Sequence, residues 1–193
     1  MNYNYGNKVP QIFGLFVIIA FIGWAVSTFL SGIHFWALPL PEGADPSGSL
    51  EVITSDWAYI FGIPLAFLGS LYYLSVITAA SMWFQTRHPL ILKSLTVVTA
   101  TGVLFSAFFV YLQLGVINEI CPFCMISAAA STMLFGLEVY MVKISDLPSF
   151  SQLISDMNNA FTRTSIIQAL FIIFTGLLVI AGFYGATLAP VPT

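Results

Sequence analysis

Long apolar runs separated by short polar stretches make up most of this chain. Each run is long enough to cross a hydrocarbon core of ~30 Å at ~1.5 Å per helical residue. We predict transmembrane helices at about residues 10–35, 61–83, 89–117, 122–142 and 165–188. Because only a few residues connect the third and fourth helices, these two must be antiparallel neighbours. The pattern predicts an all-α integral membrane protein, a four-helix transmembrane bundle plus a fifth helix, in one membrane domain over residues 1–193.

The largest polar stretch between the spans is residues 37–60. Its first half is rich in proline and glycine, which favour turns. Apolar residues then recur at intervals of three and four, namely Leu50, Ile53, Trp57 and Ile60. This spacing predicts a short amphipathic helix with Ser49 as its N-cap, lying on the membrane as a lid over the bundle. The alternative is a loop with incidental apolar residues. Similar spacing over residues 144–164 predicts a second interfacial helix.

Composition and charge support a membrane protein and give it an orientation. Hydrophobic residues make up 59% of the chain and charged residues 7%, against ~25% charged in a typical soluble domain. The predicted topology puts every basic residue on one side: Lys8, Arg87, Lys93, Lys143 and Arg163. The positive-inside rule makes that side cytoplasmic, with the N-terminus inside and the C-terminus and loop 37–60 outside. The net charge of −3 gives no indication of a nucleic-acid partner, so we expect a multi-pass cell-membrane protein surrounded by lipid.

Both cysteines of the chain lie in one tetrapeptide, Cys121-Pro122-Phe123-Cys124, at the outer end of the fourth predicted span. Proline is well suited to the first helical position, since the N–H that it lacks would have no partner there. We therefore predict Cys121 as the N-cap, with the positive end of the helix favouring a thiolate. The outer side of the membrane is also the side on which disulfides persist. The motif indicates a redox-active pair.

Other roles for the two cysteines fit less well. A structural zinc site usually has four ligands, and His34 and His88 fall on opposite sides of the membrane, so we expect no metal. Covalent haem attachment needs a histidine after the second cysteine, where Met125 stands. A structural disulfide across two residues would constrain the unfolded chain little. His34 is interpreted as an interfacial residue rather than a ligand.

Two motifs and the predicted topology resemble the vitamin K epoxide reductase family in its bacterial and archaeal, disulfide-generating form. The motifs are TSDWAYIFGIPLAFLGSLYYL at residues 54–74 and NEICPFC at residues 118–124. The resemblance covers nearly the whole chain. It implies a four-helix core around a quinone, and a membrane thiol–disulfide oxidoreductase that passes electrons from a thioredoxin-like extracytoplasmic protein to that quinone. Menaquinone, ubiquinone and phylloquinone all remain candidates.

The resemblance also implies site residues. Cys121 would exchange with the incoming thiol, Cys124 would lie beside the quinone, and Ser55 in the loop helix would assist the chemistry. Four aromatic residues are candidates for quinone contact, the first three of them chosen by their depth in the outer half of the bundle: Phe61, Phe109, Tyr111 and Phe123. Aromatic residues at this depth are also common as packing or belt residues.

One departure from the family pattern leaves alternatives open. The family normally carries a second cysteine pair in the outer loop, and here Ser49 stands where the second loop cysteine is expected. The chain is then a form trapped by Cys→Ser changes, a natural member whose partner attacks Cys121 directly, or an inactive homologue that only binds a quinone or partner. Vitamin K epoxide or quinone reduction fed by small thiols is a further alternative. Ala128, where the vertebrate enzyme has a tyrosine, disfavours the epoxide reaction.

Overall fold

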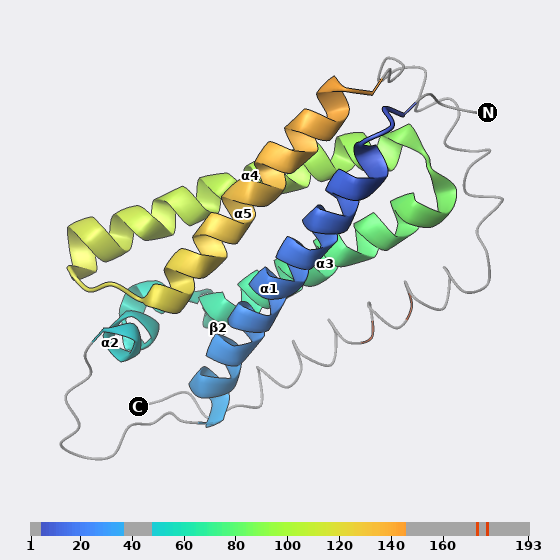
Figure 1. Ribbon diagram of the computed structural model, residues 1–193. Coiled ribbons are helices and arrows are strands. Elements are labelled where there is room, and N and C mark those ends of the chain that lie inside the picture. The colour runs from blue at the N-terminus through green and yellow to red at the C-terminus, as the bar shows by residue number, and fades with distance from the viewer. Residues whose placement is uncertain (1–4, 37–47, 146–172, 174–176, 178–193) are drawn as a thin grey trace.

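The computed structural model describes residues 5–36, 48–145, 173 and 177. Four long helices form most of this part: α1 (Val9–Trp36), α3 (Leu65–Thr86), α4 (Pro89–Leu112) and α5 (Pro122–Lys143). Each packs on two neighbours, in the cyclic order α1, α3, α4, α5 (Figure 1). The antiparallel arrangement of α4 and α5 is as predicted from their short connection. The protein is therefore an all-α bundle with a four-helix core.

The outer surface of this bundle is apolar. All four helices are long and apolar enough to span a membrane, and the third of these spans continues beyond α4 to Ile117. Large apolar side chains point outward along them, including Ile18, Val97, Leu104 and Met133. A soluble protein rarely exposes so much contiguous apolar surface, whereas lipid solvates it well. The sequence prediction of a multi-pass membrane protein agrees with this surface.

Aromatic packing closes the end of the bundle at which α1 begins. The buried indole of Trp83 packs against the ring of Phe13, with 4.3 Å between centroids, and meets Tyr5 edge-on at 5.3 Å. The Tyr5 hydroxyl donates to the carbonyl of Arg87 at 2.6 Å. Four of the basic residues lie at or near this end: Lys8, Arg87, Lys93 and Lys143. Side chains of the described residues therefore fill this end of the bundle.

At the opposite end, a short hairpin precedes α3. Strands β1 (Tyr59–Ile60) and β2 (Ile63–Pro64) pair antiparallel. Phe61 and Gly62 form the turn, with φ of 51° and 77°. Pro64 also keeps the residue before it out of helical conformation. The second span therefore begins at Leu65, later than the predicted Phe61, and continues to Thr86.

The predicted loop helix is present but shorter than its apolar pattern suggested. Helix α2 (Ser49–Thr54) is followed by one 3-10 turn, η1 (Asp56–Ala58). Its N-cap is Gly48, with φ of 59°, rather than the predicted Ser49. Ser55 ends it by adopting an extended conformation while its Oγ donates to the carbonyl of Val52 at 2.8 Å. Figure 1 shows α2 lying beside the start of α5.

Two predicted elements fall mainly outside the described residues. The fifth span, at 165–188, is described only at residues 173 and 177. The interfacial helix at 144–164 is described only at its first two residues, of which Ile144 is the C-cap of α5. Both stay predictions.

Candidate active site

The two cysteines begin helix α5 in the predicted way. Cys121 is the N-cap, Pro122 is the first helical residue, and the Cys121 sulfur accepts a hydrogen bond from the backbone N–H of Cys124 at 3.2 Å. Both thiols are free. A reduced pair with one sulfur at a helix N-terminus is a chemically competent dithiol.

The connection before Cys121 is built by residues from α4 and its extension. Helix α4 widens into a π-helical turn, η2 (Gln113–Ile117), and Asn118 then adopts a left-handed conformation with φ of 57°. Asparagine tolerates this conformation better than most residues. The buried side chain of Gln113 accepts a hydrogen bond from the backbone N–H of Cys121 at 2.9 Å. This bond positions the cysteine motif against the end of α4.

Cys121 is completely buried beneath α2. It packs with Leu30, Val52 and Ile53, and the Ser49 side chain forms a hydrogen bond with its sulfur. The pKa of Cys121 is lowered, chiefly because the Cys124 thiol donates a hydrogen bond to the sulfur. Burial acts against this shift, while the backbone N–H groups of Cys124 and Phe123 and the Ser49 side chain support it. Cys121 is therefore the sulfur that favours the thiolate.

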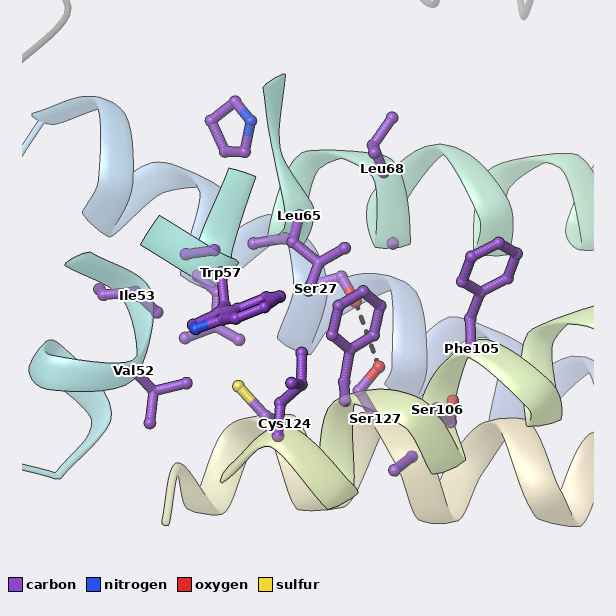
Figure 2. A pocket seen from close by; sticks show the side chains of 18 of the residues that line it. Ser27, Val52, Ile53, Trp57, Leu65, Leu68, Phe105, Ser106, Cys124 and Ser127 are labelled. Atoms are coloured by element: carbon purple, nitrogen blue, oxygen red, sulfur yellow. Dashed lines mark hydrogen bonds between the residues drawn. The ribbon is translucent and has the colours of Figure 1, made fainter. Parts of the chain in front are cut away.

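Cys124 faces a cavity of about 380 Å³ between the four helices and beneath α2. In Figure 2 its sulfur lies near Val52 and the indole of Trp57, while Phe105 and Ser106 lie further along. Most of the lining is apolar, including Leu30, Ile53, Ile60, Leu65, Leu68, Phe105, Phe109, Val110 and Leu112. Small-molecule sites are typically apolar cavities of this size with a few polar groups.

Polar side chains from several helices interrupt the apolar lining: Ser27, His34, Ser55, Tyr72, Tyr73, Thr101, Ser106, Gln113, Ser127 and Ser131. Some of them already have partners. The Tyr73 hydroxyl donates to the carbonyl of Ser127 at 2.6 Å. The His34 ring meets Tyr59 edge-on at 5.1 Å and hydrogen bonds to the backbone of Ile53, which joins α1 to α2. Among the described residues, no cluster of three or more His, Cys, Asp or Glu side chains could hold a metal ion.

The predicted site residues lie in three places: at the cavity wall, beneath α2 and on the surface of the bundle. Cys124, Ser55 and Phe109 line the cavity, whereas Cys121 lies beneath α2. Phe61 is fully exposed at the hairpin turn. Tyr111 is 65% exposed, because it lies two residues from Phe109 and so on another face of α4. Phe123 packs against Phe29 of α1 with 5.3 Å between ring centroids, and it does not line the cavity.

Comparison with protein families identifies the fold that carries this dithiol and cavity. The model of the vitamin K epoxide reductase family matches residues 14–139, well over half of the chain. The chain belongs to this family. The match contains both cysteines, α2 and most of the four long helices. A search of curated proteins gives no match.

Family membership makes the protein a membrane oxidoreductase, and enzymes of the vitamin K epoxide reductase family are in general linked to quinones. Several cavity residues were not predicted from the sequence, including Trp57, Tyr72, Tyr73, Ser127 and Ser131. A signal for the serines exists, since Ser127 and Ser131 follow Cys124 by three and seven residues and so lie on the same face of the helix. No sequence pattern predicts the two tyrosines, because their contacts with α5 depend on how α3 packs against that helix.

Proposed function

We propose that this protein is a membrane thiol–disulfide oxidoreductase that supports disulfide-bond formation. Two electrons would pass from a thioredoxin-like extracytoplasmic protein, through Cys121 and Cys124, to a membrane quinone. One observation carries the proposal: a reduced Cys-x-x-Cys pair whose second sulfur faces a large apolar cavity inside a membrane bundle. The cavity is large enough and apolar enough for a quinone ring. Its polar groups offer hydrogen bonds to carbonyl oxygens.

The two sulfurs have separate tasks in this proposal. Cys121 holds the negative charge, and the Cys124 thiol donates its hydrogen bond to it. Transfer of that proton to Cys121 leaves a thiolate on Cys124 at the cavity wall. Disulfide formation breaks the one remaining S–H bond, joins Cys121 to Cys124, and releases two electrons and one proton. A quinone in the cavity would take up both electrons, that proton and a second proton from water, and would leave as the hydroquinone.

The partner restores the dithiol by exchange. A partner thiolate attacks the Cys121 sulfur, a mixed disulfide forms, and Cys124 is released as a thiol after protonation. The partner's second thiolate then breaks the mixed disulfide, so the partner leaves oxidised and Cys121 leaves reduced. Because Cys121 is buried beneath α2, this helix has to move aside during the exchange. Ser49 touches Cys121 but cannot exchange, so the partner acts on Cys121 directly.

The side of the membrane belongs to the same proposal. The end of the bundle that carries Lys8, Arg87, Lys93 and Lys143 would face the cytoplasm. Cys121, Cys124 and α2 lie at the opposite end. The thiol exchange would then take place on the outer side, where oxidised proteins accumulate.

Reconstitution in liposomes tests the proposed function. The protein is supplied with menaquinone or ubiquinone and with a reduced thioredoxin-fold protein, and the quinone absorbance and the partner's thiols are followed together. We expect one hydroquinone for each partner disulfide, loss of turnover in Cys121→Ser and Cys124→Ser, and no loss in the control Met133→Leu on the exposed face of α5. Quinone binding without thiol oxidation would contradict the proposal and support the binding protein. Consumption of vitamin K epoxide alone, fed by small thiols, would support the epoxide reductase.

A further inference from the structure

The cavity extends beyond Cys124 to a second group of polar residues. Tyr72 of α3 and Ser131 of α5 both line it, and the Tyr72 Oη lies 3.4 Å from the Ser131 Oγ. Ser131 follows Cys124 by seven residues, which corresponds to ~10 Å along the helix axis. The cavity therefore has a thiol at one end and a pair of hydroxyls at the other.

The Tyr72 and Ser131 hydroxyls occupy space beside Gly102 of α4 that any larger residue at position 102 would fill. A Cβ at Gly102 of α4 would collide with the Tyr72 hydroxyl and would lie 2.8 Å from the Ser131 Oγ. Helices α3, α4 and α5 thus meet around these two oxygens. This close approach keeps both hydroxyls at the cavity wall, where a ligand can contact them.

The Tyr72–Ser131 pair has hydrogen-bonding capacity to spare. The neighbouring Tyr73 hydroxyl is committed, since it donates to the Ser127 carbonyl at 2.6 Å. Tyr72 and Ser131 share one long contact of 3.4 Å, close to the limit for a hydrogen bond. Two hydroxyls carry two protons, so this single contact leaves a donor available. A donor in an apolar cavity gains most from an acceptor that arrives with the ligand.

We propose that Tyr72 and Ser131 bind the quinone carbonyl that points away from Cys124, an assignment that rests on the proposed function. A close contact of ~3–3.5 Å at the sulfur and a hydrogen bond of ~2.8 Å at the hydroxyls leave room for one quinone ring within the ~10 Å between these residues. There the hydroxyls stabilise negative charge that develops on the far oxygen.

Quinone binding to the disulfide form tests this assignment without depending on turnover. Trp57 lines the cavity, so quenching of tryptophan fluorescence by a 1,4-naphthoquinone reports the Kd. We expect Tyr72→Phe to weaken quinone binding about tenfold. Ser131→Ala should also weaken it. A matched control is Ser70→Ala, which removes a hydroxyl contact of 2.9 Å between α3 and Thr28 of α1 away from the cavity.

The results separate this assignment from the proposed function. A wild-type Kd in both Tyr72→Phe and Ser131→Ala would overturn the assignment, even if the wild type oxidises its thiols with quinone. Weakened binding in these variants, with a melting temperature like that of Ser70→Ala, would support it even if the wild type fails to transfer electrons. Absence of quinone binding by the wild type would overturn both.

Discussion

Cys121 and Cys124 lie one helical turn apart but in different surroundings. Cys121 is buried beneath α2 and accepts hydrogen bonds, whereas Cys124 donates one and faces the cavity. This asymmetry gives the first sulfur the charge and the second sulfur access to a ligand. Under the proposed function, one proton moving between them changes which sulfur is nucleophilic.

The thiolate titration of the reduced protein tests the origin of the lowered pKa of Cys121. With only two cysteines in the chain, thiolate absorbance reports this pair alone at pH values below those at which tyrosine ionises. We expect the first thiolate to form at a lower pH than in an ordinary cysteine. Cys124→Ala should move that transition to higher pH because it removes the main donor, and Ser49→Ala should move it less in the same direction. An unchanged titration in Cys124→Ala would refute the hydrogen bond as the cause.

A cysteine introduced at position 49 should bond to Cys121. The Ser49 side chain already contacts the Cys121 sulfur, so Ser49→Cys places a third sulfur beside it. After mild oxidation, we expect peptide mapping to recover a disulfide between the introduced cysteine and Cys121. The control Asp56→Cys introduces an exposed thiol just beyond α2 and should give no such bond. Recovery of the Cys121–Cys124 disulfide alone from Ser49→Cys would show that Ser49 is not held against Cys121.

At the residue scale, the sequence predicted local backbone geometry better than it predicted which side chains face the interior of the bundle. The N-cap role of Cys121 follows from Pro122 beside it, so neighbouring residues were sufficient. The quinone-contact candidates were chosen by depth, and depth does not specify which side of a helix faces the bundle. Phe109 lines the cavity, while Tyr111 at nearly the same depth is exposed. The Tyr72–Ser131 contact depends on Gly102 in a third helix, and no local pattern encodes it.

Helix α2 is the element that separates Cys121 from the surface. Polar contacts tie this helix and its N-cap to the bundle, and one of them is the hydrogen bond between Ser49 and the Cys121 sulfur. The backbone N–H of Gly48 donates to Glu119 Oε2 at 3.1 Å, and the His34 ring hydrogen bonds to the backbone of Ile53. Val52 and Ile53 add a small apolar contact with Leu30. So short a helix can open at modest cost.

Removing the Glu119 contact should loosen α2 without affecting the bundle. Hydrogen bonds to charged groups contribute ~1.5–3 kcal/mol, so Glu119→Ala should raise the open population about tenfold or more. Hydrogen exchange of the amides in residues 48–54 measures this change. Glu51→Ala on α2 itself serves as the control. Equal exchange rates in the wild type and Glu119→Ala would mean that this contact does not hold α2.

At the scale of elements, the transmembrane spans could be predicted, but the residues at which α3 begins and α2 ends could not. Long apolar runs give length directly, and the first and third spans match the prediction closely. The start of α3 was misplaced because Phe61-Gly62 belongs to an apolar run yet forms a hairpin turn. Likewise, α2 ends at Thr54 because the Ser55 hydroxyl donates a hydrogen bond to the carbonyl of Val52. The spacing of apolar residues does not predict this helix end.

In the part of the chain that the structure describes, aromatic side chains fill one end of the bundle, and the dithiol and the cavity lie toward the other. Trp83, Phe13 and Tyr5 close the end that carries most of the basic residues, while the dithiol, α2 and the cavity lie toward the other. The apolar outer surface keeps the bundle in lipid, the phase in which quinones dissolve. Under the proposed function, this arrangement joins a thiol partner outside the membrane to an acceptor within it.

A single-turnover experiment tests the central claim most directly. The fully reduced protein, in detergent and without partner, is mixed with a 1,4-quinone, and free thiols and quinone absorbance are followed together. We predict that one quinone is reduced for every two thiols lost, with a Cys121–Cys124 disulfide as the protein product. Thiols that stay reduced, with an unchanged quinone spectrum under conditions where the quinone binds, would contradict the account.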